Sequence, residues 1–243
     1  MIEKEKVVIV DAGNSRIKTA LFENGLISKI QRFNYSQAKA FQDFVRLHDS
    51  PKIFISSVLS NSDLKDFIHK TENITLLHPE MIFPVDIKYG SKDTLGMDRL
   101  ANACAIQSVK PDGNKVAIDL GTCIKFDFVD EKGIYHGGSI SPGLNMRLKA
   151  LHHFTGKLPL VEPKKGVNYL GRSSEESILA GVIEGMQGEL NHFISRYLQD
   201  YQGLTFFVTG GDAKFFDFPL KNNIFANENL TLTGLYKIYL LNA

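Results

Sequence analysis

Two segments far apart in the chain place the same residue types at nearly the same spacing. In each, an apolar run ends at an aspartate, a glycine follows two residues later, and a hydroxyl residue precedes a second apolar run. Glycine lets the backbone approach an anion closely, successive N–H groups bind phosphate oxygens, and a carboxylate holds cations. Two such turns facing each other would clamp a metal ion and a phosphate chain. The segments read VVIVDAGNSRIKTALFENG (7–25) and KVAIDLGTCIKFDFVDEKG (115–133).

The repetition decides between two interpretations of this pattern. A single Asp-x-Gly is most simply a hairpin turn. Two copies, each after a buried strand and each followed by a hydroxyl residue, favour phosphate binding. Asp11 corresponds to Asp119, and, with one residue skipped, the segment 15–18 lies over the segment 122–125. Lys18 could neutralise phosphate charge.

Composition excludes several classes of function. The 243 residues are 43% hydrophobic, which allows a sizeable core, and a net charge of +1 makes nucleic acid a weak candidate partner. Two cysteines without a C-x-x-C pattern exclude a disulfide framework and fit a reducing compartment. The seven histidines show no spacing that fits zinc. Without a signal peptide or a run of ~20 apolar residues, we expect a cytoplasmic globular protein with no membrane partner.

The elements that would position these turns alternate along the chain. The rhythm of strands and helices in the first half predicts an α/β fold, with a sheet covered by helices. A strong turn signal at 111–114 predicts a boundary between domains 1–113 and 114–243, each with one copy of the hairpin. The expected strands cover 7–10, 17–22, 52–58, 74–77 and 204–208, and the expected helices cover 36–47, 62–69, 100–109, 145–153, a long segment from a capping box at 173–176, and a last segment from about 233.

Together these residues resemble a known family. The paired hairpins resemble the two phosphate loops of the acetate and sugar kinase/Hsp70/actin superfamily. Tyr89, followed seven residues later by Gly96-Met97-Asp98-Arg99, resembles the Gly-x-Asp-Arg motif of type III pantothenate kinase. Further matches to that family are Gly137–Gly143, Leu158-Pro159, Gly171–Ser174 before a helix with Gly181, and Thr209–Asp212 at the position of its adenosine loop.

The resemblance implies a fold and an activity. The fold would consist of two duplicated ribonuclease H-like (actin-like ATPase) domains, with the active site in the cleft between them, in a homodimer. The activity would be ATP-dependent phosphorylation of pantothenate to 4'-phosphopantothenate, the first step of coenzyme A biosynthesis. The implied cofactors are ATP, Mg²⁺ and a monovalent cation, K⁺ or NH₄⁺.

The resemblance also assigns roles to individual residues. ATP and its phosphates would be bound by Asp11, Ala12, Gly13, Asn14, Ser15, Arg16, Ile17, Lys18, Gly121, Thr122, Gly210 and Gly211. Pantothenate would be bound by Tyr89, Gly96, Met97, Asp98, Arg99 and Ser174, the last supplied near the partner subunit. Asp98 would accept the proton, Asp11 would lie nearest Mg²⁺, and Asp119 would hold the monovalent cation.

The chemistry of Asp98 and Arg99 agrees with these roles. Phosphoryl transfer needs positioning, charge neutralisation and a carboxylate that orients the attacking hydroxyl. Asp98 at a helix N-terminus stays ionised, orients the hydroxyl and accepts its proton late, while Arg99 offers a planar fork for the pantothenate carboxylate. The alternative for this pair is a helix cap with a surface ion pair.

Two features depart from simple expectation. The family usually continues its second loop with small and hydroxyl residues, whereas this chain has Cys123-Ile124-Lys125. Lys125 could compensate, unless strand alternation directs its side chain away. In the long helix, Gly181, Gly185 and Gly188 each cost about 1 kcal/mol relative to Ala, which indicates either close packing of a helix or subunit, or a pocket at that face.

Two other functions compete with the kinase. A non-catalytic regulator on the same scaffold, similar to an accessory transcription factor, would tolerate loss of Asp11, Asp98 or Asp119, and all three are present. Another kinase or a phosphatase of the superfamily would lack the Gly-x-Asp-Arg motif and would have a longer chain.

Overall fold

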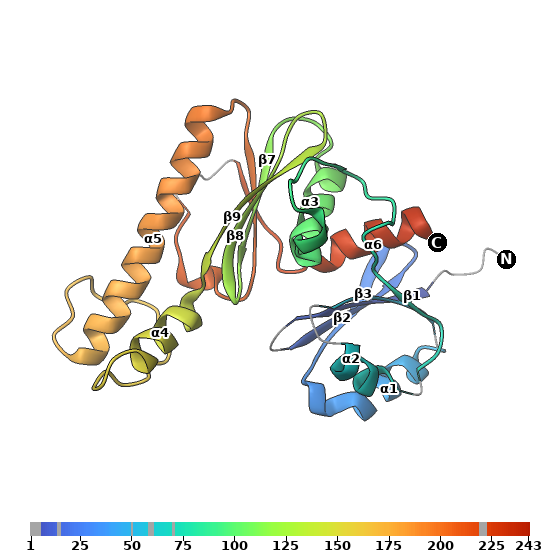
Figure 1. Ribbon diagram of the computed structural model, residues 1–243, viewed down its shortest axis with the longest axis horizontal. Helices are drawn as coiled ribbons and strands as arrows, with labels where there is room; N and C mark the ends of the chain where they lie inside the picture. Colours follow the sequence, from blue (N-terminus) through green and yellow to red (C-terminus); the bar gives the residue numbers. More distant parts are fainter. Residues whose placement is uncertain (1–5, 14–15, 50, 58–60, 70, 219–222) are drawn as a thin grey trace. The chain divides into compact units, whose positions relative to one another are not determined.

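The chain folds into two compact units. The computed structural model describes residues 6–13, 16–49, 51–57, 61–69, 71–218 and 223–243 (Figure 1). The first unit comprises residues 1–109 and 229–243, and the second comprises residues 110–228. The chain passes from the first unit to the second after residue 109, four residues before the boundary expected from the sequence. The last helix differs, because it belongs to the first unit and not to the second.

The first unit is built on a five-stranded sheet in the order β3-β2-β1-β4-β5. Its first three strands form an antiparallel meander, and β4 and β5 follow parallel to β1. The strands are β1 (Lys6–Ala12), β2 (Ile17–Glu23), β3 (Leu26–Phe33), β4 (Lys52–Ser57) and β5 (Ile74–Leu76). Helices α1 (Ala38–Leu47) and α2 (Asn61–Ile68) lie on one face of this sheet and α6 (Leu230–Asn242) lies on the other, as Figure 1 shows. Phenylalanines of α1 and α2 pack into the core on the first face, and Tyr236 of α6 stacks on Phe22 of β2.

The second unit repeats this topology. Its five strands lie in the order β11-β10-β7-β8-β9, again a meander followed by two strands parallel to the first. The strands are β7 (Lys115–Leu120), β8 (Cys123–Val129), β9 (Ile134–Pro142), β10 (Thr205–Thr209) and β11 (Ile224–Ala226). The apolar stripe of α5 (Ser174–Asp200) packs on this sheet, and α4 (Leu144–His153) lies against α5. The prediction of an α/β fold with two related halves is confirmed.

The described residues contain five further elements. They are three short 3₁₀ turns, η1 (Tyr35–Gln37), η2 (Lys92–Thr94) and η3 (Ala213–Phe215), the two-residue strand β6 (Asp86–Ile87), and α3 (Met97–Val109). Helix α3 starts three residues before the predicted Leu100, and α6 starts three residues before the predicted Thr233. Among the described residues, no helix is both long and apolar enough to cross a membrane.

The last helix joins the first unit because α3 and α6 pack backbone to backbone. Both helices are largely buried, and α3 carries the small residues Ala101, Ala103 and Cys104 along its length. A Cβ atom added at Gly234 of α6 would lie 1.8 Å from the carbonyl oxygen of Ala101. Only glycine therefore permits this crossing, and the crossing fixes the helix that begins with the Gly-x-Asp-Arg motif.

We predict that Gly234→Ala destabilises the protein despite the higher helix propensity of alanine. The added methyl group overlaps Ala101, and overpacking of this kind costs about 1–3 kcal/mol. Gly188→Ala is the matched control: it also lies inside a helix, but no neighbouring atom lies within 4 Å of its added Cβ. That variant should be neutral or gain up to about 1 kcal/mol. Calorimetric melting of both variants checks the prediction, and equal melting temperatures would contradict it.

Candidate active site

The first hairpin ends in a turn that places Asp11 beside Lys18. In the β1–β2 ladder Asp11 pairs with Lys18 and Ala12 pairs with Ile17. The N–H of Gly13 donates to the carbonyl of Arg16 across the turn, at 3.1 Å. Two of the residues predicted to bind phosphate, Asn14 and Ser15, lie outside the described residues. The structure thus brings the carboxylate, the glycine and the lysine of the predicted loop to one end of the sheet.

A residue that the sequence reasoning missed holds this turn. The hydroxyl of Tyr35, in η1, donates a hydrogen bond to the carbonyl oxygen of Gly13. Tyr35 also packs edge-on against Phe67 of α2. The first loop is therefore tied to the helical layer that covers its sheet. No motif marks Tyr35, because it lies 22 residues from the turn that it supports.

The second hairpin repeats the register of the first. Asp119 pairs with Lys125, and Leu120 pairs with Ile124. The N–H of Gly121 donates to the carbonyl of Cys123 at 3.2 Å. The alignment of the two copies with one residue skipped is thereby confirmed, because both hairpins pair a lysine with the aspartate one residue before the end of the first strand.

The direction of Lys125 is settled by a contact. Its Nζ lies 2.7 Å from Oδ2 of Asp119, and the side chains of Lys125 and Asp119 are only 12% and 13% exposed. Cross-strand partners share a face of the sheet, so strand alternation points Lys125 toward Asp119 and not away from it. The carboxylate that was expected to bind K⁺ or NH₄⁺ is engaged by an ammonium group of this chain.

Glycines of the segment 137–143 support the second turn. A Cβ at Gly138 would lie 1.7 Å from the carbonyl oxygen of Phe126, so β9 can pair with β8 only with glycine there. A Cβ at Gly143 would lie 2.3 Å from the carbonyl oxygen of Gly121, and the N–H of Gly143 donates to Thr122 at 3.1 Å. These glycines of the family pattern therefore let β9 and the residue after it pack directly against β8 and the second turn.

The predicted adenosine loop lies against the end of β7. Gly210 has a φ of +96°, and an added Cβ would lie within 2.5 Å of the backbone of Leu120. Both its backbone conformation and its close packing therefore require glycine. The N–H of Asp212 donates to the carbonyl of Leu120 at 3.0 Å. Burial raises the pKa of the Asp212 carboxyl, Lys214 lowers it, and the nearby charge of Asp119 raises it further. Asp212 therefore joins the electrostatic neighbourhood of Asp119, which its sequence position did not reveal.

The Gly-x-Asp-Arg motif forms the first turn of α3. Asp98 Oδ1 accepts the N–H of Arg99 at 2.9 Å, and a Cβ at Gly96 would lie 2.7 Å from that same oxygen. The guanidinium of Arg99 stacks over the ring of Tyr89 at 5.7 Å, and its Nη1 donates to the Tyr89 hydroxyl at 3.4 Å. Arg99 is only 4% exposed, which argues against the alternative of a surface ion pair. Tyr89, Asp98 and Arg99 are thus brought together within the first unit.

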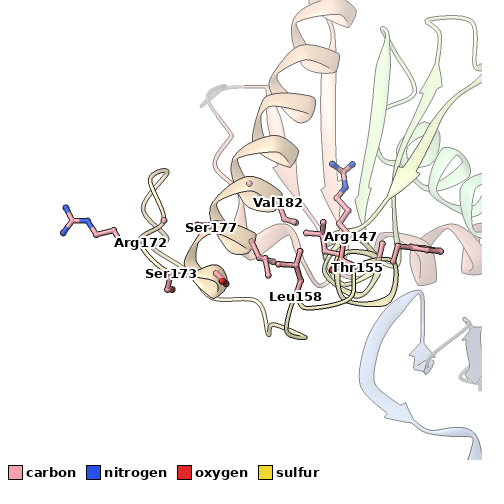
Figure 2. Close-up of a pocket in the computed structure, with 14 residues that line it drawn as sticks. Arg147, Thr155, Leu158, Arg172, Ser173, Ser177 and Val182 are labelled. Atoms are coloured by element: carbon pink, nitrogen blue, oxygen red, sulfur yellow. Dashed lines mark hydrogen bonds between the residues drawn. The ribbon is translucent and has the colours of Figure 1, made fainter.

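Ser174 lies in a large cavity of the second unit, which we call the α4–α5 cavity. Its volume is about 1240 Å³, and Figure 2 shows labelled residues from both helices and the intervening segment, with the Arg172 side chain directed away. Its walls are Arg147, Ala150, Leu151, Phe154, Thr155, Leu158, Gly171, Arg172, Ser173, Ser174, Ser177, Ile178, Gly181 and Val182. Gly181 therefore lines a pocket, while Gly185 and Gly188 lie exposed on the same helix.

The start of α5 beside this cavity is capped as predicted. The N–H of Glu176 donates to Oγ of Ser173 at 3.2 Å. The Glu176 carboxylate accepts the N–H of Arg172 at 2.7 Å, one residue before the position expected in a capping box. A Cβ at Gly171 would lie 2.3 Å from the backbone nitrogen of Ser177, so the segment before α5 packs directly against the backbone of the first turn of the helix. Ser174 is thus held at a rigid helix start.

The two cation sites expected from the resemblance differ in their fit. Among the described residues, no group of three or more His, Cys, Asp or Glu side chains could hold a metal ion. Mg²⁺ usually takes only one or two carboxylates and completes its shell with phosphate and water, so partly buried Asp11 fits that role. Asp119 fits a second cation poorly, because Lys125 already engages it.

Comparison with known sequences gives a consistent result. Residues 7–196 match the family model described as type III pantothenate kinase. The type III pantothenate kinase of Christiangramia forsetii is 41% identical over 94% of this chain and 95% of its own length. The enzyme of that name from Phocaeicola vulgatus is also 41% identical, over 95% of this chain and 96% of its own.

Comparison with solved structures supports the fold. A protein described as a Baf family transcriptional activator from Campylobacter jejuni superposes with a TM-score of 0.61 at 24% identity, over 97% of this chain and 98% of its own. An inorganic polyphosphate/ATP-glucomannokinase from Arthrobacter gives 0.50 at 13% identity, over 97% and 99%. These low identities establish the fold alone, which is that of the actin-like ATPases. The sequence matches go further, and by them this chain belongs to the type III pantothenate kinase family.

Proposed function

We propose that this protein transfers the γ-phosphoryl group of ATP to pantothenate and so forms 4'-phosphopantothenate, the first step of coenzyme A biosynthesis. The observation that carries the proposal is the cluster of Tyr89, Asp98 and Arg99 at the start of α3, in a chain that also repeats the Asp-x-Gly hairpin. The hairpins supply phosphate-binding groups, and the cluster supplies a carboxylate and a guanidinium for an acid that carries a hydroxyl.

The hairpins would bind the triphosphate. Asp11 is the proposed Mg²⁺ ligand, and Lys18 opposite it would neutralise phosphate charge. Asp11 would hold Mg²⁺, which would offset part of the charge of the phosphates. The glycine N–H groups of both turns close the turns internally, so we assign phosphate contacts in the second loop chiefly to Thr122. The close contact of Gly210 with β7 would place the adenosine loop beside it.

Asp98 and Arg99 would orient pantothenate. A helix N-terminus favours the ionised form of Asp98, which can orient the hydroxyl and accept its proton as the phosphorus–oxygen bond forms. The contacts of Arg99 with the ring and the hydroxyl of Tyr89 restrict its guanidinium, which would orient the fork before the substrate carboxylate binds. Desolvation strengthens such a pairing, since the guanidinium is buried.

The competing functions are less well supported. A regulator on this scaffold would have no need for Asp11, Asp98 and Asp119, which all occupy structured positions at strand or helix ends. The resemblance to a Baf family activator is a resemblance of fold. Other superfamily kinases and phosphatases leave the Gly-x-Asp-Arg cluster without a role.

We also propose a cytoplasmic homodimer. ATP use and unbridged Cys104 and Cys123 fit a reducing compartment. Phe154, which lines the α4–α5 cavity, is 81% exposed, and Tyr169, two residues before the lining residue Gly171, is 79% exposed. Such exposure of two large aromatic side chains favours an interaction surface. Ser174 would then reach the substrate of the partner.

We predict that the protein converts ATP and pantothenate to phosphopantothenate and that Asp98→Asn lowers kcat about 10²–10⁴-fold. The amide keeps the shape of the side chain but cannot accept the proton. Asp93→Asn, which changes an exposed acid in η2, is the matched control and should retain wild-type turnover. Product is measured by mass, and circular dichroism confirms the fold of both variants.

Two results would count against this assignment. No phosphopantothenate in K⁺, NH₄⁺ or Na⁺ would rule out the proposed activity. Near-normal turnover of Asp98→Asn would leave the activity standing but remove Asp98 as the proton acceptor.

For the homodimer, we predict that the double variant Phe154→Glu/Tyr169→Glu sediments as a monomer. Charges at an apolar subunit contact must be desolvated without partners, which is costly. Leu26→Glu, at a 74% exposed position of the first unit, should leave the dimer intact. Analytical ultracentrifugation of the three proteins tests this proposal, and a wild-type monomer at micromolar concentration would refute it.

A further inference from the structure

The second hairpin carries its own cation at the carboxylate that the family resemblance assigns to K⁺ or NH₄⁺. Lys125 Nζ lies 2.7 Å from Asp119 Oδ2, and both side chains are nearly buried. The two residues face each other in the β7–β8 ladder, so strand pairing holds their side chains on the same face of the sheet and within reach of each other.

The lysine head group is chemically a tethered ammonium ion. It is compact, carries one positive charge and offers three N–H donors, as NH₄⁺ offers four. We infer that Lys125 supplies in cis the charge that a monovalent cation would bring to Asp119, so that this enzyme works without K⁺ or NH₄⁺ at that site. The part of this inference that concerns turnover rests on the proposed phosphotransfer.

A dissolved cation competes poorly with this arrangement. To take the Asp119 oxygen, K⁺ must displace a group of the same chain, whose effective concentration is in the millimolar range or above. To share the carboxylate, it must lie beside a like charge. At about 4 Å and an effective dielectric constant of about 20, that repulsion lowers affinity by several hundred-fold.

The acid nearest to this pair in the described electrostatics, Asp212, also has a lysine of this chain, Lys214, as a neighbour. Asp212 lies on the loop that packs against β7, and its N–H donates to Leu120. Burial raises the pKa of the Asp212 carboxyl, Lys214 lowers it and Asp119 raises it, so the two acids sense each other. Two acids, Asp119 and Asp212, therefore accompany two lysines, Lys125 and Lys214.

A different role for Lys125 makes a different prediction. Lys18 occupies the same register position in the first hairpin and is expected to neutralise phosphate. If Lys125 instead contacted phosphate, its loss would weaken ATP binding equally in every salt. If Lys125 replaces a cation, added K⁺ or NH₄⁺ should restore the turnover that is lost when Lys125 is removed.

The test compares wild type, Lys125→Met and the exposed-lysine control Lys132→Met in K⁺, NH₄⁺ or N-methylglucamine chloride at equal ionic strength. We expect wild-type and Lys132→Met turnover to agree in the three salts within about two-fold. Lys125→Met should lose at least about ten-fold in N-methylglucamine and regain activity in K⁺ or NH₄⁺. Lys125→Thr is the second variant if the methionine variant does not fold.

A binding readout is independent of turnover. In ²⁰⁵Tl NMR with thallium(I) nitrate as the probe for K⁺, we expect a bound signal in Lys125→Met. No bound signal is expected in wild type or in Lys125→Met/Asp119→Asn.

Two results would overturn the inference: a wild type that needs K⁺ or binds thallium, or a Lys125→Met variant that is equally impaired in all salts and binds no thallium. Absence of phosphopantothenate in every salt would refute the proposed function instead, and the thallium arm would still decide the role of Lys125.

Discussion

In both halves of the chain, strand pairing places a lysine opposite the aspartate that lies one residue before the end of a buried strand. Asp11 faces Lys18, and Asp119 faces Lys125. The strands before these acids are buried, so a slip of one residue would carry their apolar side chains out of the core. The core therefore fixes the register, and the register fixes which charges lie at the ends of the hairpins. The proposed phosphate binding and the proposed internal cation both depend on this one constraint.

The two hairpins are supported differently although they share a register. The first turn is tied by the Tyr35 hydroxyl to a helical layer. The second is enclosed by backbone, with Gly143 on one side and Gly210 on the other, each too close for a Cβ. A rigid second turn suits a built-in ammonium ion, because a fixed carboxylate and a fixed lysine lose little entropy on pairing. This difference gives the less typical loop of the chain a physical role of its own.

The sequence predicts those features that arise from local patterns. The hairpins, the long capped helix and the relation between the halves follow from alternation, glycine spacing and the capping signal at Ser173. Strand β3 was not predicted, because it is mostly exposed and lacks a regular apolar alternation. The place of α6 depends on its contact with Ala101, more than 120 residues away, which no local pattern encodes. For the same reason Tyr35 and Asp212 were missed as neighbours of the two turns.

The most direct measurement is an ¹H–¹⁵N correlation spectrum of the protein titrated with a non-hydrolysable ATP analogue and Mg²⁺. The account predicts that the amides of Gly13 in the first hairpin and of Gly121 and Thr122 in the second shift together and saturate at one ligand concentration. Shifts confined to one hairpin, or absent from both, would contradict the claim that the duplicated turns are the phosphate loops of this protein.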